Sequence, residues 1–291
     1  MNRLLFIVNP MAGGGRARSL EPLITKTMEE YKIEYDLVFT SREGDGAKLA
    51  EESCCNRVIA VGGDGTVNEV AKGLLKRGYG VMGIIPSGTG NDLSRSLGIP
   101  LDPLKAIEFV INGKTRFIDV GVANGNYFLN IASFGFDAEV VINSHRFKRL
   151  YRGKIAYILG IILTLIKFKK REITLEIDGK EYRESLILLA IGNGKYYGGG
   201  MKILPDSNLD DGYLHLCLIK DASNLLLLIL FPTIFSGKHL RYSRYVNIFK
   251  AKNVKIRSNS LEIFNIDGEI IHGENEIIFN ISDHKLPIMC I

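Results

Sequence analysis

The chain of 291 residues contains no tryptophan, 8 prolines and 4 cysteines. The cysteines show neither a CxxC spacing nor a spacing to histidine that would indicate a zinc site. The adjacent pair Cys54 and Cys55 is poorly suited to an ordinary disulfide. We therefore expect free thiols in a reducing compartment. The sequence also lacks the combined aromatic and basic motif of RNA-binding sheets, so nucleic acid is not expected as a partner.

Long hydrophobic runs are missing as well. The two most apolar stretches, residues 155–168 and 225–235, are shorter than the roughly 20 residues that a membrane-spanning helix needs. Residues 1–8 hold one arginine and a short apolar run, which is typical of a strand rather than of a secretory signal. We expect a cytoplasmic protein that contacts membranes only peripherally.

The composition is that of an ordinary globular protein. Hydrophobic residues make up 46% and charged residues 24%, which excludes a disordered chain. The length fits about two domains. The 31 glycines indicate tight turns or close backbone approaches. The net charge of +5 favours anionic partners such as phosphates or a membrane surface.

The first third of the chain alternates short apolar runs with segments of helical periodicity. This alternation predicts βαβ units and a mainly parallel sheet, with the chemistry in loops at the carboxyl ends of the strands. The expected strands are 4–8, 34–40, 57–61 and 81–85, and the expected helices include 47–53 and 67–77.

The pattern changes near residue 114, where β patterns joined by turn signals begin. We expect a Rossmann-like α/β domain over residues 1–115 and a mostly antiparallel, sandwich-like β domain over 116–284. Residues 285–291 are free to return to the first domain. The expected strands of the second domain are 116–122, 127–130, 173–177, 186–191, 213–219, 247–256, 261–266 and 276–281, with helix within 140–168 and 222–235.

Three glycine-rich loops, 9–15, 62–68 and 87–92, each follow an expected parallel strand. Glycine allows backbone N–H groups to approach phosphate oxygens, and a following helix N-terminus favours negative charge. A single loop of this kind is usually only a turn, but three at one sheet edge favour a nucleotide site. Neither common nucleotide fingerprint is present. Asp64 inside the second loop either supports Mg²⁺ on a nucleotide or caps the following helix.

The combination of motifs resembles the lipid kinases with a diacylglycerol kinase catalytic domain, which include soluble bacterial diacylglycerol kinases and the sphingosine and ceramide kinases. GGDGT alone is shared with NAD kinases and phosphofructokinases, but the further motifs make the resemblance more specific and extend it over essentially the whole chain. The motifs are Asn9-Pro10, GGDGT (62–66), GTGND (88–92), FLNIASFGFD (128–137), GNGKYYGGG (192–200), PDSNLDDG (205–212) and DGE (267–269).

The resemblance implies roles for particular residues. It implies that Asp267 or Glu269 accepts the proton of the lipid hydroxyl, with Asp64 as a third catalytic residue that organises the metal. It implies a structural Mg²⁺ site made by the side chain of Asp211 and the backbone carbonyls of Asn208 and Tyr213. The implied ATP-binding residues are Asn9, Pro10, Met11, Ala12, Gly13, Thr40, Gly62, Gly63, Asp64, Gly65, Thr66, Val67, Asn68 and Thr89.

The carboxylates at these motifs also have purely structural interpretations. As alternate residues of an extended segment, Asp267 and Glu269 can point the same way, whereas Asp-Gly between two strands is a common hairpin turn. The segment 210–212 is likewise either a turn or a metal site. On the catalytic interpretation, Asp267→Asn abolishes turnover without unfolding the protein.

Basic residues flank both apolar stretches, as expected for a surface that rests on anionic lipid. The alternative is a pair of core helices with solvated charged ends. The residues before the first stretch are His145, Arg146, Lys148, Arg149, Arg152 and Lys154, those at its end are Lys167, Lys169, Lys170 and Arg171, and those after the second are Lys238, His239, Arg241 and Arg244.

The leading hypothesis is an ATP-dependent lipid kinase that transfers the γ-phosphoryl group of Mg-ATP to the hydroxyl of diacylglycerol and gives phosphatidic acid. The alternatives are a kinase for sphingosine, ceramide or phosphatidylglycerol, an NAD kinase, or a non-catalytic regulator that binds lipid or nucleotide. The expected partners are the lipid substrate and an anionic membrane surface, and a homodimer is left open.

Overall fold

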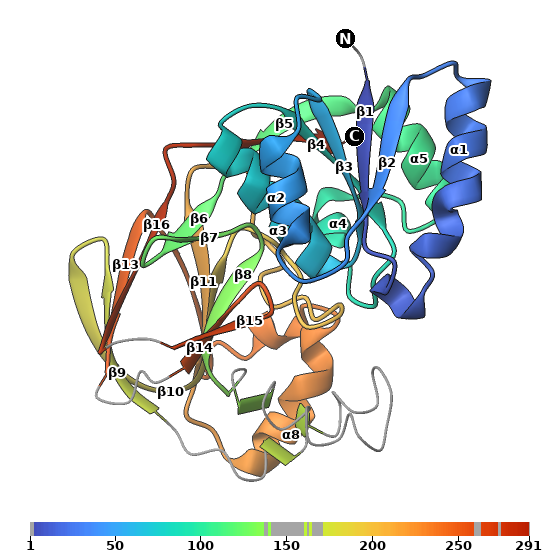
Figure 1. The fold of residues 1–291 in the computed structure, drawn as a ribbon. Coiled ribbons are helices and arrows are strands. Elements are labelled where there is room, and N and C mark those ends of the chain that lie inside the picture. Colours follow the sequence, from blue (N-terminus) through green and yellow to red (C-terminus); the bar gives the residue numbers. More distant parts are fainter. Residues whose placement is uncertain are drawn as a thin grey trace. The chain divides into compact units, whose positions relative to one another are not determined.

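The computed structural model describes residues 3–136, 139–140, 160–161, 163–164, 171–258, 263–272 and 275–290. The chain forms two compact units, each with its own sheet (Figure 1). The first unit comprises Met1–Val120, Gly198–Gly200 and Asp283–Ile291, and the second comprises Gly121–Tyr197 and Met201–Ser282. The mixed α/β fold with a mainly parallel sheet and a separate antiparallel sheet confirms the fold class predicted from the sequence.

The sheet of the first unit has six strands in the order β2-β1-β3-β4-β17-β5. The first four strands pair in parallel, β17 is parallel to β4, and β5 is antiparallel to β17. The carboxyl ends of β1, β3 and β4 therefore lie at one edge. The bounds are β1 (Leu4–Val8), β2 (Tyr35–Phe39), β3 (Arg57–Gly62), β4 (Val81–Pro86), β5 (Lys114–Ile118) and β17 (Leu286–Cys290).

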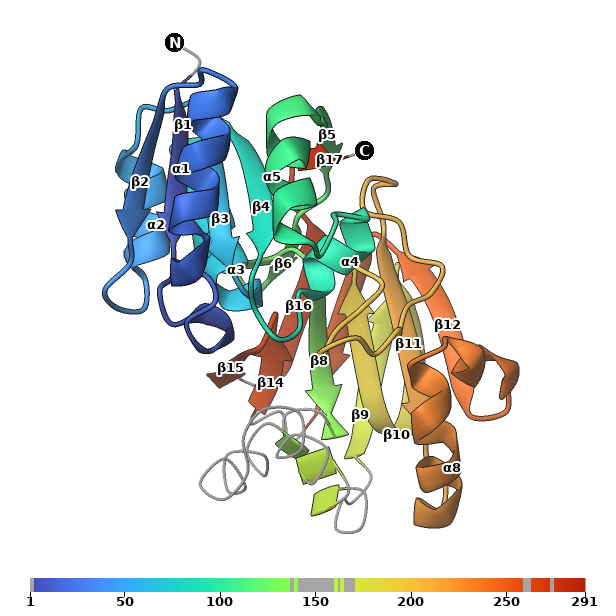
Figure 2. The ribbon, with the colours of Figure 1, turned by 90° about the vertical axis from the view of Figure 1, so that its right-hand side faces the viewer.

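Helices cover both faces of this sheet. Figure 2 shows α1 and α5 over one face, where Ile24, Met28 and Val110 join the buried cluster that contains Phe6 and Ile59. On the other face α2 packs closely on α3. The close contact requires glycine at position 73, since a Cβ there would lie 2.2 Å from the carbonyl oxygen of Ala47. The helices are α1 (Glu21–Glu30), α2 (Asp45–Glu52), α3 (Asp64–Arg77), α4 (Asp92–Leu97) and α5 (Pro103–Asn112), with 3₁₀ turns η1 (Ala12–Gly14) and η2 (Arg18–Leu20).

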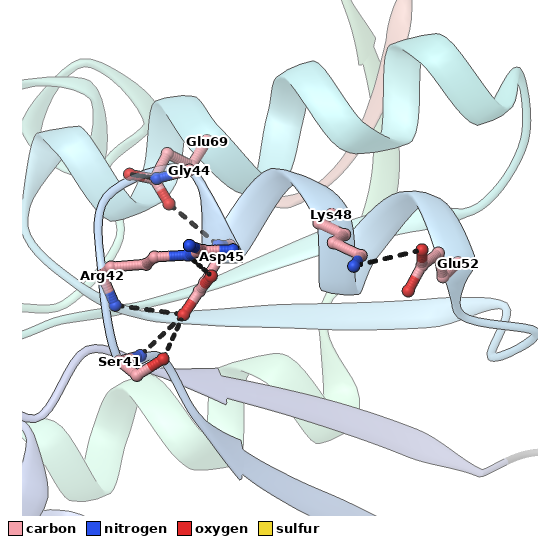
Figure 3. A network of polar contacts seen from close by, with 8 residues as sticks. Ser41, Arg42, Gly44, Asp45, Lys48, Glu52 and Glu69 are labelled. Carbon is pink, nitrogen blue, oxygen red and sulfur yellow. Dashed lines mark hydrogen bonds and ion pairs between the residues drawn. The ribbon is translucent and has the colours of Figure 1, made fainter.

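Two carboxylates fix the start of α2 (Figure 3). Asp45 accepts hydrogen bonds from the N–H and hydroxyl of Ser41 and from the N–H of Arg42, and these bonds hold its pKa below the ordinary value. Glu69 of α3 accepts from the N–H groups of Gly44 and Gly46 at 3.0 and 2.9 Å. Glu69 thus ties the N-terminus of α2 to the helix that follows the GGDGT motif.

Glu69→Ala should lower the free energy of unfolding by about 1 to 2 kcal/mol, because two helix-start amides lose their acceptor. Glu51→Ala is the matched control: Glu51 of α2 also reaches α3, but through an exposed ion pair with Lys76. Such pairs contribute at most about 1 kcal/mol. Denaturant titration of both variants checks the difference, and equal losses would show that the two amide contacts add nothing.

In the described part of the second unit, eleven strands form one antiparallel sheet. Phe128, Phe264 and Phe279 fill the core on one face of the curled sheet. The strands are β6 (Gly121–Ala123), β7 (Asn126–Phe128), β8 (Ile131–Gly135), β9 (Arg171–Ile177), β10 (Lys180–Gly192), β11 (Leu214–Lys220), β12 (Val246–Ala251), β13 (Asn253–Arg257), β14 (Ile263–Ile266), β15 (Glu269–His272) and β16 (Glu276–Ile281).

Residues 186–192 of the central strand β10 are buried on both faces. Leu189 and Ile191 belong to the cluster that contains the three phenylalanines, whereas Leu188 and Ala190 belong to a second cluster under α8 (Asn224–Ile234). This double burial explains why residues 186–191 form a continuous apolar run rather than an alternating one.

None of the four cysteines forms a disulfide in the structure, and burial raises the pKa of the Cys217 thiol to about 12.

Two of the strands predicted from the sequence are each divided into two strands in the structure. Residues 116–122 change sheets, since β5 lies in the first unit and β6 in the second, and the units divide after Val120 rather than after residue 115. Residues 247–256 split at Lys252, where the N–H groups of Lys252 and Asn253 donate to Asp178 and turn the chain from β12 to β13.

The first apolar stretch and its basic flanks lie largely outside the described residues. This applies to the residues at 145–154 and 167–170, whereas Arg171 begins β9. Among the residues that the structure describes, no helix is long and apolar enough to cross a membrane.

Candidate functional site

The three glycine-rich loops contact one another in the first unit. A Cβ on Gly13 would lie 2.1 Å from the carbonyl oxygen of Ser87, and one on Gly88 would lie 2.3 Å from the Cα of Gly63. Gly13 also has a φ of 61°, in the left-handed region. Close backbone approach therefore requires glycine at these positions, and the three loops lie against one another at the carboxyl edge of the sheet.

The first loop begins directly after β1. The N–H of Asn9 donates to the carbonyl of Val61 at 3.0 Å, and its side-chain oxygen accepts from the N–H of Met11. Pro10, Ala12 and Gly13 are partly exposed, and Met11 is 79% exposed. Thr40 follows β2, is buried, and donates its N–H to the carbonyl of Val8 at 2.9 Å. The carboxyl ends of β2, β1 and β3 are thereby joined.

The second loop becomes helix earlier than expected. The sequence predicts a helix from Val67, but α3 begins at Asp64, with Gly63 as an extended N-cap. Among the described residues no side chain caps this terminus. The first-turn amides of α3 and the positive end of its dipole are thus available to an anion. Gly62 lies against Thr66, and Thr66, Val67 and Asn68 are buried, whereas Gly65 is exposed.

Asp64 does not cap its own helix. Its Oδ2 accepts from the N–H of Asn91 at 2.8 Å and its Oδ1 from the N–H of Asp92 at 2.7 Å. Asp64 therefore satisfies amides at the start of α4 and ties the second loop to the third. The sequence offered a metal-binding or an N-cap role for Asp64; it did not reveal this contact, which joins residues 27 and 28 positions apart.

The third loop is shaped by Asn91, which adopts a φ of 55°. The Asn91 side chain accepts from the N–H of Gly88 and donates to its carbonyl, while Thr89 is exposed. Arg16 donates to the same carbonyl at 3.1 Å and brings a positive charge to the junction of the loops. Arg16 and Asn91 were not among the sequence-predicted site residues, although Asn91 lies within the GTGND motif that signalled this loop.

Asp92, in the same motif, was likewise not among the sequence-predicted site residues. It is 5% exposed, and its Oδ2 accepts from the N–H of Gly199 at 2.8 Å. Within the described part of the chain its buried Oδ1 has no hydrogen-bond partner. Burial and the neighbouring charge of Asp64 raise the pKa of Asp92 to about 6, against the opposing effect of the Gly199 and Gly200 amides. Two close carboxylates with one unpartnered oxygen suit a divalent cation.

Asp92→Asn should stabilise the nucleotide-free, metal-free protein at high pH. The pKa of Asp92 is raised above its unfolded value of 3.8, so the wild type loses stability as pH rises through about 6. A shift of this size destabilises the wild type by about 2 to 3 kcal/mol at pH 8, by about 0.5 kcal/mol at pH 4 and by almost nothing below about pH 3. Thermal unfolding of both proteins with chelator across this pH range should show that the stability of the variant relative to the wild type increases toward alkaline pH. Parallel curves of stability against pH would contradict a buried charge on Asp92.

The DGE segment of the second unit is a hairpin turn. Ile266 of β14 pairs with Glu269 of β15, and the two intervening residues, Asp267 and Gly268, have φ values of 48° and 94°. Positive φ at both central positions is the signature of a type I′ turn. The sequence left open an extended segment or a hairpin turn, and the structure shows the turn, because Asp267 lies between the strands and Glu269 begins β15.

The turn nevertheless holds Asp267 rigidly. Its Oδ2 accepts from the N–H of Leu129 at 2.7 Å, and its Oδ1 accepts from the N–H groups of Asn130 and Ile131 at 3.1 and 2.9 Å. Its own N–H donates to the carbonyl of Ile131. These contacts fix the orientation of the carboxylate at the start of β8, within the FLNIASFGFD motif. Glu269 is partly exposed.

At the expected structural Mg²⁺ site, the Asp211 side chain is bound to basic side chains. The Oδ2 of Asp211 lies 3.0 Å from both His215 Nε2 and Lys250 Nζ, and its Oδ1 accepts from the N–H of Tyr213. The contacts with Lys250 and His215 hold the pKa of Asp211 below its ordinary value, against the opposing effect of partial burial. Asn208 is exposed. The expected Mg²⁺ site at Asp211 stays a prediction, and a cation bound at this Oδ2 would have to displace the ammonium of Lys250. The described residues include no group of three or more acidic, histidine or cysteine side chains that could hold a metal.

Comparison with known proteins identifies the family. Residues 3–123 match the diacylglycerol kinase catalytic domain, and residues 130–289 match the YegS C-terminal NAD kinase beta sandwich-like domain. A diacylglycerol kinase of Bacillus subtilis (strain 168) is 33% identical over 274 residues, which cover 92% of this chain and 90% of that protein. The chain belongs to the diacylglycerol kinase family. The diacylglycerol kinase of Staphylococcus carnosus (strain TM300) is 31% identical over 92% of this chain and 88% of that protein.

Solved structures agree with this assignment. A Bacillus anthracis structure superposes with a TM-score of 0.82 at 29% identity, covering 100% of this chain and 95% of that one. An NAD kinase from Archaeoglobus fulgidus in complex with ATP superposes with a TM-score of 0.52 at 12% identity over 99% and 93% of the two chains, which shows a shared fold. The family resemblance expected from the motifs is confirmed. This member of the diacylglycerol kinase family is a kinase that transfers phosphate to a hydroxyl acceptor, and its family implies the use of ATP.

Proposed function

We propose that this kinase transfers the γ-phosphoryl group of Mg-ATP to the hydroxyl of a diacylglycerol and produces phosphatidic acid. The observation that carries the proposal is the contact of Gly13 with Ser87 and of Gly63 with Gly88. This contact gathers three loops around a helix start that no described side chain caps. The names of the relatives, diacylglycerol kinases, support the choice of acceptor.

The loops of the first unit bind the nucleotide. The amides at the start of α3 donate to phosphate oxygens, for which helix N-termini are suited. Arg16, fixed by its bond to Gly88, neutralises phosphate charge. The remaining sequence-predicted positions in the first loop, with Thr40 and Thr89, surround the rest of the nucleotide. Catalysis in such a site is mostly positioning and charge neutralisation.

Asp64 and Asp92 would hold the Mg²⁺ ion of the nucleotide. The unpartnered, buried Oδ1 of Asp92 beside the charge of Asp64 is the donor set that fits this ion. Bound Mg²⁺ supplies neutralisation of the charge on the β- and γ-phosphates. The two carboxylates also keep the third loop in place, since Asp64 accepts two of its amides and Asp92 accepts from Gly199. Loss of the Asp64 carboxylate therefore disturbs the shape of the third loop, because an asparagine there could accept from only one of the two amides.

Asp267 accepts the proton of the lipid hydroxyl. A general base must be held in a fixed orientation toward the group that it deprotonates. The three amides from Leu129 to Ile131 give Asp267 that orientation. Glu269, which follows on β15, is the second candidate for this role, and Glu269→Gln compared with Asp267→Asn separates the two.

The test is transfer of label from γ-labelled ATP in the presence of Mg²⁺. The acceptors are diacylglycerol, monoacylglycerol, sphingosine, ceramide and phosphatidylglycerol in mixed micelles with anionic phospholipid, and NAD in parallel wells. The proposal predicts label in the lipid phase, with diacylglycerol as the best acceptor. If another lipid accepts more label than diacylglycerol, that lipid replaces diacylglycerol as the assigned substrate. Label on NAD alone would overturn the proposal.

A further inference from the structure

The helix α8 is apolar around most of its circumference. Its sequence, NLLLLILFPTI, contains no charged residue. One face is buried against the sheet of its own unit, where Leu227, Leu230 and Ile234 are at most 7% exposed. These side chains join the buried cluster that includes Leu188 of β10 and Ile219 of β11. Figure 2 shows α8 beside these two strands. Through this buried face, α8 forms part of the core of its own unit.

The opposite face carries equally apolar side chains into solvent. Leu225 is 70%, Ile229 56% and Leu228 40% exposed. Phe235, at the C-cap, is 46% exposed and lies about two helical turns beyond Leu228, on the same side of the helix. A helix that only covers a core presents polar residues on this face. An apolar face on the outside of the protein indicates a partner that is itself apolar.

Basic residues adjoin this face at the end of the helix. Gly237, with a φ of 72°, turns the chain into the 3₁₀ helix η3 (Lys238–Arg241). Lys238, Arg241 and Arg244 are exposed, and Tyr242 beside them is 37% exposed. The opposite end of the helix is preceded by the exposed acidic residue Asp221. The positive charge thus gathers beyond the C-terminal end of α8.

We propose that the α8 surface, defined as Leu225, Leu228, Ile229 and Phe235 with Lys238, Arg241 and Arg244, docks on a bilayer that contains anionic lipids. The inference rests on the proposed function in one respect, since it supplies the place at which a membrane-borne substrate is approached. The helix is too short to span a bilayer, but its face suits the interface between headgroups and acyl chains. The basic residues match a negative lipid surface and disfavour a second copy, which would bring the same charges.

Flotation with vesicles tests the surface without ATP. The vesicles contain phosphatidylcholine alone or a mixture of phosphatidylcholine and phosphatidylglycerol. The double variant Leu225→Gln with Ile229→Gln should lose at least about tenfold in partitioning to the mixed vesicles. Leu104→Gln is the matched control, because Leu104 is a 44% exposed leucine on α5 of the other unit. The control should bind as the wild type does.

The basic residues make a separable contribution. Lys238→Gln and Arg241→Gln should each lower partitioning to the mixed vesicles by about fivefold, and added salt should remove that difference. Partitioning to vesicles of phosphatidylcholine alone should not change. This pattern separates attraction to anionic headgroups from insertion of the apolar face.

Two results would overturn the inference. One is wild-type flotation by the apolar double variant. The other is a wild-type dimer in size-exclusion chromatography that the double variant dissociates while flotation is unchanged, because the face would then be covered by a second copy. Phosphorylation of a short-chain diacylglycerol dispersed as monomers should be unaffected by these variants. If no acceptor is phosphorylated by the wild type but flotation behaves as described, the proposed function fails and the docking surface stands.

Discussion

Asp267→Asn is expected to lower turnover at least about a hundredfold, because positioned general bases contribute roughly 10² to 10⁴ in rate. The asparagine cannot accept a proton from the hydroxyl, although it has nearly the same size. Binding of ATP should not change, since the loops that are proposed to bind it belong to the other unit. The measurement is kcat with diacylglycerol, together with the dissociation constant of ATP.

The same substitution also has a structural cost. Asp267 accepts from the amides of Leu129, Asn130 and Ile131 through both oxygens, and an asparagine offers only one acceptor oxygen. A buried amide that loses its acceptor costs about 1 to 3 kcal/mol. The expectation from the sequence that this substitution leaves the fold untouched is therefore replaced by a measurable loss of stability.

Asp178→Asn separates the two effects. Asp178 lies in the turn between β9 and β10, has a φ of 46°, is followed by a glycine, and accepts from the amides of Lys252 and Asn253. It is an Asp-Gly turn with amide contacts that lies outside the proposed catalytic residues. Asp178→Asn should lower stability and leave turnover unchanged. If Asp267→Asn behaves in the same way, Asp267 is a structural residue and not the base.

Gly88→Ala is expected to have the largest effect on the nucleotide site. The added Cβ would lie 2.3 Å from the Cα of Gly63, and neither backbone can yield as a flexible side chain would. The second and third loops must separate, which should lower the free energy of unfolding by about 3 kcal/mol or more. Because the loops are proposed to bind ATP, its affinity should fall at least about tenfold.

Gly65→Ala is the control for the stability effect. Apart from its chain neighbours and the backbone of its own helix, no described atom lies within 4 Å of a Cβ at this position, which is exposed in the first turn of α3. Alanine should therefore be neutral or stabilising by up to about 1 kcal/mol. Denaturant titration and calorimetric ATP binding check the pair of variants. Wild-type affinity and stability in Gly88→Ala would show that the loops do not need their close contact.

Local patterns predicted the elements of the first unit well. The strand predicted over 4–8 is β1, and those predicted over 57–61 and 81–85 each differ from β3 and β4 by one residue. Buried parallel strands are continuous apolar runs, and the glycine loops mark their ends. The strand at 116–122 was harder, because its division between two sheets depends on pairing with β17, about 170 residues away. Nearby, the buried Asp119 pairs with Lys285 at 2.8 Å.

The site residues show the same limit. Motif spacing drew attention to Asp64 and Asp267, but their actual partners, the amides of Asn91 and Leu129, come from distant segments. The motif that contains Asp92 was recognised, whereas its burial beside Asp64 could not be read from the sequence. Likewise the sequence did not indicate that Lys250 of β12 reaches Asp211. Local composition therefore located the motifs, and tertiary contacts determined what each side chain touches.

Identification of the product formed from ATP and a long-chain diacylglycerol tests the central claim most directly. Wild-type protein, Mg²⁺-ATP and the lipid in mixed micelles should yield phosphatidic acid by mass spectrometry, and Asp267→Asn should yield almost none. Release of inorganic phosphate with unmodified lipid, or equal product from both proteins, would contradict the assignment of Asp267 as the base in transfer to a lipid hydroxyl.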